Sequence, residues 1–200
     1  MSDTTASIAV DQRAVRGTSS SVLGMTLFIA SEAMFFAAFF GAYFTIFAAT
    51  AVWPPPNIPI PELTTASVAT AMLVISSVFV QMAVSAARRG LTQKVNLWLG
   101  ITIALGLGFL ILQTLDYSRV GFSIHDGTYA SLFYIMTGLH MAHVVGGVLF
   151  LMLVLAQSRG GQLSPQRTDP VQAAAMYWDF VDVVWVGLFV VFYILPQGGS

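Results

Sequence analysis

The sequence predicts an all-α integral membrane protein in which five helices form one bundle. Hydrophobic residues make up 56% of the chain and charged residues only 8%, while the mean hydropathy is +0.80. A soluble protein needs a much larger charged share, roughly 25–35% of its surface. Five apolar stretches are each long enough to cross a bilayer, which takes about 20 residues. Nearly the whole chain is therefore expected to lie in a membrane.

The five expected spans cover residues 21–49, 65–87, 96–115, 128–156 and 173–195. Because hydrocarbon offers no water to backbone groups, each span must satisfy its own hydrogen bonds, and a helix does so. The connections are too short for a second folded unit, so we expect 21–195 to be a single transmembrane domain. A polar tail at 1–20 and a short tail at 196–200 remain. The apolar run after the first tail is too long for a signal-peptide core, so we expect it to be retained.

The Lys and Arg residues predict the orientation of the bundle. Only Arg119 follows the third span. The other seven cations precede the first span or follow the second and fourth; they are Arg13, Arg16, Arg88, Arg89, Lys94, Arg159 and Arg167. Because short cytoplasmic connections carry an excess of Lys and Arg, we expect the N-terminus inside and the C-terminus outside.

Other features of the composition exclude several classes of protein. The chain has no cysteine, so thiolate metal sites and cysteine nucleophiles are excluded. A net charge of -1 gives no case for a nucleic-acid partner. Neither the inverted repeats nor the broken helices typical of transporters are visible in the sequence. A small independent membrane transporter is therefore a distant alternative.

Glu32 is one of five ionisable residues that lie inside the expected spans. It lies about 16 Å beyond the start of its span, near the middle of the membrane. Its helical neighbours include Phe28, Phe35 and Phe36. A charged group in hydrocarbon costs about 2.5–3.5 kcal/mol, so we expect a neutral acid. Glu32 is either a structural acid bonded to a neighbouring helix or a group that moves protons or binds a lipid headgroup.

His140 and His143 lie three residues apart in the fourth expected span, so both are expected to project from one side of the helix. Gly138, Ala142 and Gly146 lie on roughly the opposite side, where small residues favour close helix contact in lipid. Two His on one turn could share a metal, but no Glu-x-x-His pair accompanies them. We therefore expect a polar interface, formed by hydrogen-bonded packing or by a partner subunit, and no metal site.

Asp179 and Asp182 lie three residues apart near the inner side of the fifth expected span. Trp178, Asp182 and Trp185 share one stripe of the helix. Two close carboxylates do not both ionise cheaply, so a shared proton or a partner such as His, Arg or an amide is expected. The pair is either a hydrogen-bonded structural feature or an antenna that gathers protons from the inner side for an adjacent site.

Taken in order along the chain, these motifs resemble subunit III of the haem-copper oxidases, in the short five-span bacterial form. The match runs nearly from end to end, and the order and spacing of the motifs make it specific. The positions that carry it are Ser31, Glu32, Phe35, Phe36, Ser76, Ser77, Gln113, Asp116, Asp126, Gly127, Gly138, His140, His143, Trp178, Asp182 and Trp185.

The resemblance implies a bundle with a lipid-filled cleft that packs against subunit I, with subunit II as a further partner. Haems and copper would lie in those partners, so this chain would hold no catalytic residue and no cofactor, only bound phospholipid. Cytochrome c would donate electrons to the complex rather than to this chain. The chain would stabilise subunit I, assist proton uptake and guide oxygen through the cleft. Its location would be the cytoplasmic membrane of a bacterium, in aerobic electron transport with proton translocation.

Two positions depart from the family pattern. The family usually has His at the position of Asp179, so a titrating base is replaced by an acid, and it usually has Glu at that of Asp116. A quinol oxidase usually has Asp at the position of Glu32, so this residue favours the cytochrome c branch. Subunit III of a quinol oxidase or of a nitric oxide reductase is the closest alternative, with the same fold and role.

Overall fold

The computed structural model describes residues 20–56, 58–163 and 168–197. Its helices are α1 (Ser20–Ala49), α2 (Leu63–Arg88), α3 (Thr92–Arg119), α4 (Thr128–Arg159) and α5 (Asp169–Phe189). A π-helical turn at Val190–Ile194 and a 3-10 turn at Leu195–Gln197 continue α5. The described residues contain no strand, and all five helices are long and apolar enough to cross a membrane. The prediction of an all-α protein with five spans is confirmed.

Several helices extend beyond the predicted spans. α3 begins at Thr92 rather than at 96 and ends at Arg119 rather than at 115, and α5 begins at Asp169 rather than at 173. Hydropathy marks only the residues suited to hydrocarbon, whereas a helix continues until its backbone bonds are capped or replaced. Pro170 lies in the first turn of α5, where its missing N–H breaks no helical bond.

Parts of the predicted tails lie outside the described residues, namely 1–19 and 198–200. Residues 196–197 belong to the 3-10 turn rather than to a tail. The helical path therefore continues slightly beyond the predicted end of the fifth span.

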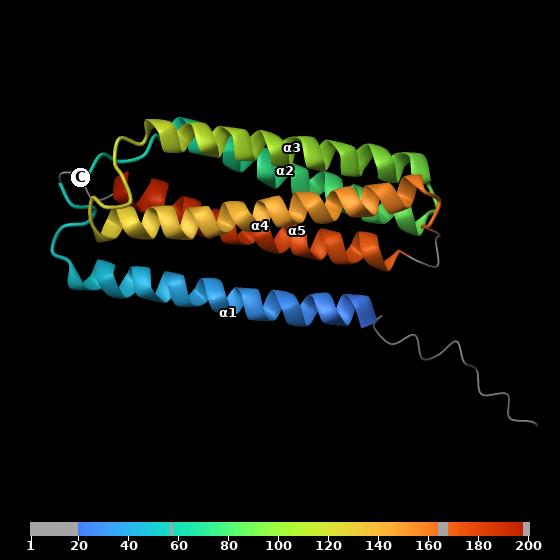
Figure 1. Ribbon diagram of the computed structural model, residues 1–200, viewed down its shortest axis with the longest axis horizontal. Coiled ribbons are helices and arrows are strands. Elements are labelled where there is room, and N and C mark those ends of the chain that lie inside the picture. The colour runs from blue at the N-terminus through green and yellow to red at the C-terminus, as the bar shows by residue number, and fades with distance from the viewer. Residues whose placement is uncertain (1–19, 57, 164–167, 198–200) are drawn as a thin grey trace, which may run out of the picture.

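The helices run alternately in opposite directions, so the connections gather at two ends of the bundle (Figure 1). One end holds the start of α1 and the α2–α3 and α4–α5 connections. Its described cations are Arg88, Arg89, Lys94 and Arg159, and we call it the basic end. The opposite end holds the α1–α2 and α3–α4 connections and Arg119. The described charges are thus separated as predicted, whereas Arg13, Arg16 and Arg167 lie outside the described residues. The side of the membrane that each end faces stays a prediction.

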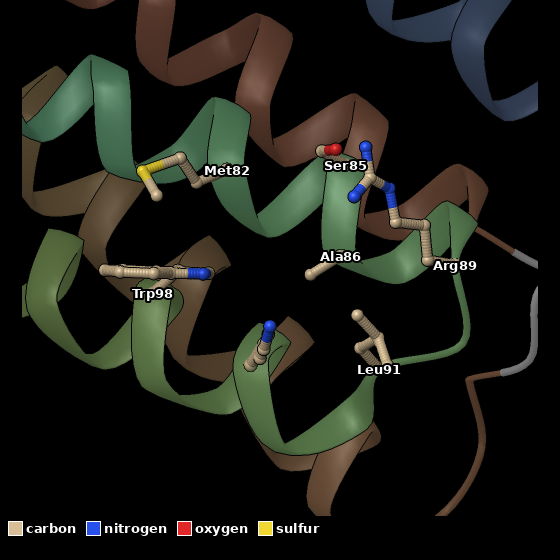
Figure 2. Close-up of a pocket in the computed structure, with 7 residues that line it drawn as sticks. Met82, Ser85, Ala86, Arg89, Leu91 and Trp98 are labelled. Carbon is tan, nitrogen blue, oxygen red and sulfur yellow. The ribbon is translucent and has the colours of Figure 1, made fainter.

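A tight turn joins α2 to α3 at the basic end. The N–H of Leu91 donates to the carbonyl of Ala86 (3.0 Å), and the N–H of Gly90 donates to that of Ala87 (3.0 Å). This pair of bonds is the Schellman arrangement, and Gly90 adopts the left-handed conformation that it needs, with φ of 70°. The turn brings Arg89, just after α2, and Lys94, in the first turn of α3, to the rim of one pocket (Figure 2).

Helices α2 to α5 pack closely around Trp178, which is fully buried. A Cβ at Gly106 of α3 would lie 2.6 Å from Cη2 of Trp178, and one at Gly147 of α4 would lie 2.9 Å from Cε3. No side chain fits at either position without displacing the indole ring. The predicted small-residue ridge is less crowded, since a Cβ would lie 3.9 Å from its nearest atom at Gly138 and 3.4 Å at Gly146.

α1 lies along the outside of this four-helix unit (Figure 1). Of its 30 residues, Val22, Phe36 and Tyr43 are buried, and the helix packs mainly on α5 and less on α4. The ring of Phe40 lies against Gly187 of α5, where a Cβ would be 3.0 Å from it. The position of α1 against the bundle therefore depends on a narrow strip of contacts.

Candidate functional site

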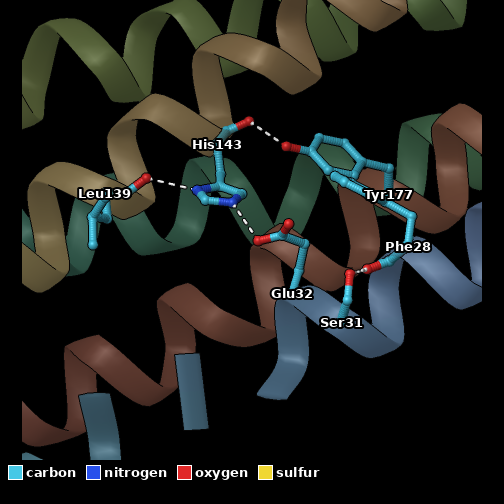
Figure 3. Close-up of polar contacts among 6 residues, drawn as sticks. All are labelled: Phe28, Ser31, Glu32, Leu139, His143 and Tyr177. Atoms are coloured by element: carbon cyan, nitrogen blue, oxygen red, sulfur yellow. Dashed lines mark hydrogen bonds and ion pairs between the residues drawn. The ribbon is translucent and has the colours of Figure 1, made fainter. Parts of the chain in front are cut away.

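Glu32 and His143 meet between α1 and α4 near the middle of both helices (Figure 3). Glu32 Oε2 lies 3.1 Å from His143 Nε2. The other ring nitrogen, Nδ1, lies 2.8 Å from the carbonyl oxygen of Leu139, one turn earlier in α4. Tyr177 of α5 donates its hydroxyl to the carbonyl of His143 (3.1 Å). Three helices therefore meet at this point.

The hydrogen bonds of His143 restrict where the protons of the pair lie. A carbonyl oxygen only accepts, so Nδ1 carries a proton and donates it to Leu139. The contact with Glu32 then needs one further proton, held either by the carboxyl or by Nε2. Both arrangements have zero net charge, which suits a site in hydrocarbon. Glu32 is bonded to a neighbouring helix through a basic partner, and its neutral state stays a prediction.

His140 lies in a different environment from His143. Its side chain is fully buried, with its ring stacked on Trp185 (centroids 5.1 Å apart) and edge-on to Phe109 (5.8 Å). Neither ring nitrogen has a hydrogen-bond partner among the described residues. A three-residue step offsets the two rings by about 60° around the helix, and of the two only His143 has hydrogen-bond partners among the described residues. Contact of either His with a partner subunit stays a prediction. His140 faces α3 and α5, whereas His143 faces α1.

Asp179 and Asp182 lie between α5 and α2, and each has its own donor. The side-chain amide of Gln81 donates to Asp179, and the hydroxyl of Ser77 donates to Asp182. The second carboxyl oxygen of each acid is buried and has no hydrogen-bond partner among the described residues. An amide partner was one of the expected solutions, and the two acids share no direct bond in the structure. We call these four residues the acid cluster.

The acid cluster borders a shallow groove of about 380 Å³ between α2 and α5. Its remaining walls are apolar, from Val74, Val183 and Val186. Asp179 lies ten residues from the start of α5, or about 15 Å from the basic end.

Hydroxyl groups of α2 also fix the signature residues of α5. The indole N–H of Trp178 donates to Ser76 (2.8 Å), and that of Trp185 donates to Thr70 (2.9 Å). Together with Ser77, these hydroxyls bind the stripe of Trp178, Asp182 and Trp185. These three hydrogen bonds hold the α5 stripe against one face of α2. The sequence predicted the stripe but not its partners.

Motif residues near the opposite end form a separate hydrogen-bonded group. We call Gln113, Asp116 and Tyr193 the lock at Asp116. Tyr193 donates its hydroxyl to Asp116 (2.7 Å) and accepts from the amide of Gln113 (3.2 Å). In the α3–α4 connection, Asp126 accepts from the backbone N–H of Ser123 (2.5 Å), and Gly127 has φ of 123° just before α4. These positions therefore fix the π-helical turn that follows α5 and the start of α4.

Sequence reasoning missed Gln81, Tyr177 and Tyr193, whose only signal was a polar group in an apolar run. Within residues 20–56, 58–163 and 168–197, no three His, Cys, Asp or Glu side chains are close enough to hold a metal ion. The groups with exchangeable protons are thus distributed over three places: the Glu32–His143 pair, the acid cluster and the lock at Asp116.

Comparison with known proteins gives similarity along most of the chain. A family model described as cytochrome c oxidase subunit III matches residues 8–197. A probable cytochrome c oxidase subunit 3 from Nocardia farcinica is 37% identical over 175 residues, which cover 86% of each chain. The cytochrome c oxidase subunit 3 of Corynebacterium diphtheriae is 37% identical over 183 residues, covering 86% of this chain and 87% of that protein. That of Thermostichus vulcanus is 34% identical over 177 residues, or 88% of both chains.

Proposed function

This chain belongs to the cytochrome c oxidase subunit III family, and we propose that it is the non-redox subunit of a bacterial terminal oxidase that takes electrons from cytochrome c. In this proposal it spans the cytoplasmic membrane with its basic end inside. Subunits I and II are its partners and hold the haems and copper. Its own contribution is to support subunit I, to supply protons at the inner face and to line a lipid cleft through which oxygen passes.

The acid cluster is the observation that carries the proton role. Asp179 and Asp182 lie on one side of a groove and keep two carboxyl oxygens without a partner among the described residues. Each already accepts one hydrogen bond, and the remaining oxygen is an acceptor that can take up a proton. Closely spaced carboxylates also raise the local concentration of protons at a surface. A cluster near the inside is suited to feeding an uptake path.

The role in supporting subunit I rests on the exposed surface of α1. Large apolar side chains such as Leu27, Met34 and Phe44 are exposed along this helix. In a membrane this surface meets either lipid or another subunit, and small differences in packing decide between them.

The same fold would serve in a quinol oxidase or a nitric oxide reductase, and the haem spectrum of the purified complex distinguishes these alternatives.

We expect Asp179→Asn together with Asp182→Asn to lower oxidase turnover most strongly at alkaline pH. The reason is that protons are scarce there and an antenna contributes most, whereas at acidic pH direct uptake suffices. Turnover of the purified complex is measured across the pH range, with Asp126→Asn at the opposite end as the control. A pH profile unchanged from that of the unaltered complex contradicts the proton role. Loss of the complex during purification would instead show a structural role.

A further inference from the structure

A pocket of about 180 Å³ opens between α2 and α3 at the basic end (Figure 2). It shares no lining residue with the Glu32–His143 pair or with the acid cluster. Seven side chains line it: Met82, Ser85, Ala86, Arg89, Leu91, Lys94 and Trp98. Two of them are cations, none is an acid, and the described residues show no ion pair for either cation.

The polar groups of the pocket are mainly hydrogen-bond donors. Arg89 and Lys94 donate from charged groups and accept nothing, and the indole of Trp98 offers one N–H. In Figure 2 the indole nitrogen of Trp98 points into the space between the two helices. The ring is held there by stacking on Phe79, with centroids 5.5 Å apart and planes 14° apart. Ser85 adds a hydroxyl one turn before Arg89. This set suits an anion with several oxygens, such as a phosphate.

An apolar groove continues from the pocket along α2. It has a volume of about 520 Å³ and shares Met82 and Ser85 with the pocket, and it extends past Val78 to Ser77. Val78 is eleven residues from Arg89, which corresponds to about 16 Å along the helix. One leaflet of a bilayer contributes about 15 Å of hydrocarbon. The distance from the cations to the far end of the groove thus matches a single acyl chain in one leaflet.

We infer that this pocket binds an anionic phospholipid of the leaflet at the basic end. The phosphate lies between Arg89 and Lys94, and one acyl chain follows α2 past Met82 and Val78. Basic pockets between membrane helices favour such headgroups, and Trp is common at this depth. A lipid is favoured over free phosphate because the donors and the apolar groove are continuous. The acyl chain ends beside Ser77, where it shields the groove of the acid cluster from other lipids.

The first test counts lipids in the intact complex, purified in mild detergent. We expect Arg89→Gln together with Lys94→Gln to lose one anionic phospholipid per complex, measured by mass spectrometry of the extracted lipids. Arg88→Gln is the matched control, since this neighbouring cation does not line the pocket. Val78→Trp keeps both cations but fills the groove, and we expect it to lose the same lipid. Full retention in the double variant or in Val78→Trp overturns the inference.

The second test uses the unaltered complex, so it does not depend on whether the variants assemble. Phosphatidylglycerol with a photoreactive acyl chain is added in phosphatidylcholine vesicles, and labelled peptides are identified. We expect labelling within residues 78–98 that persists in excess inorganic phosphate. Labelling only outside residues 78–98 overturns the inference. Loss of the labelling in excess phosphate also overturns it, because the pocket then binds a free anion rather than a lipid. Neither readout depends on turnover, so this test and that of the proton role can fail separately.

Discussion

The four-helix unit α2–α5 and the outer helix α1 are held in different ways. In the unit, glycines admit Trp178 at short range and hydroxyls of α2 bind the indole groups of α5. α1 buries only three residues and reaches the unit through ring contacts such as Phe36 with Phe180 and through a few hydrogen bonds. Because lipid is as apolar as a helix surface, hydrophobicity does not hold α1 in place. The difference shows that close packing stabilises the unit, whereas α1 has fewer packing contacts, so each of its hydrogen bonds contributes a larger share.

The polar contacts of α1 lie at two depths. Near the middle, Glu32 contacts His143. Near the opposite end, Tyr43 donates to the carbonyl of Val191 (3.1 Å) and accepts from the indole of Trp53 (2.9 Å). Two separated attachments fix both the position and the tilt of a helix that otherwise has a smooth apolar surface.

The largest expected effect comes from filling the space around Trp178. Gly106→Leu drives a side chain into the indole ring and should destabilise the unit by about 1–3 kcal/mol through overpacking. Gly100→Leu on the same helix is the matched control, since nothing lies within 4 Å of its Cβ position. Thermal unfolding in detergent compares the two variants. Equal stability of both would show that packing at Trp178 does not hold the unit.

A smaller effect is expected from removing the contact between α1 and α4. Glu32→Ala should loosen α1 by about 0.6–1.7 kcal/mol, the range measured for hydrogen bonds between membrane helices. Hydrogen exchange should rise in α1 and stay unchanged in α2–α5. Ser31→Ala is the control, because among the described residues the hydroxyl of Ser31 bonds only to the carbonyl of Phe28 in its own helix. Faster exchange throughout the bundle would contradict the division into a unit and an attached helix.

The smallest effect is expected inside the unit. Ser76→Ala removes the acceptor of the Trp178 indole but leaves its packing intact, so the loss should be about 0.6 kcal/mol. Ser118→Ala is the control, since the one partner of its hydroxyl in the described part of the chain is the carbonyl of Leu115 in the same helix. A loss in Ser76→Ala larger than that in Gly106→Leu would reverse the order, and hydrogen bonding would then be the main support of the unit.

The sequence by itself determined the membrane class, the number of helices and the separation of charges between the two ends. These depend on local composition, because a helix in hydrocarbon needs about 20 apolar residues whatever its neighbours are. It also indicated Asp179 and Asp182 as a pair in need of donors. The tertiary structure decided the partners, since Glu32 and His143 are 111 residues apart and Gln81 and Asp179 are 98 apart. Membrane helices are apolar on most sides, so their sequences do not mark which face meets which neighbour; only the packing of glycines, indoles and hydroxyls does.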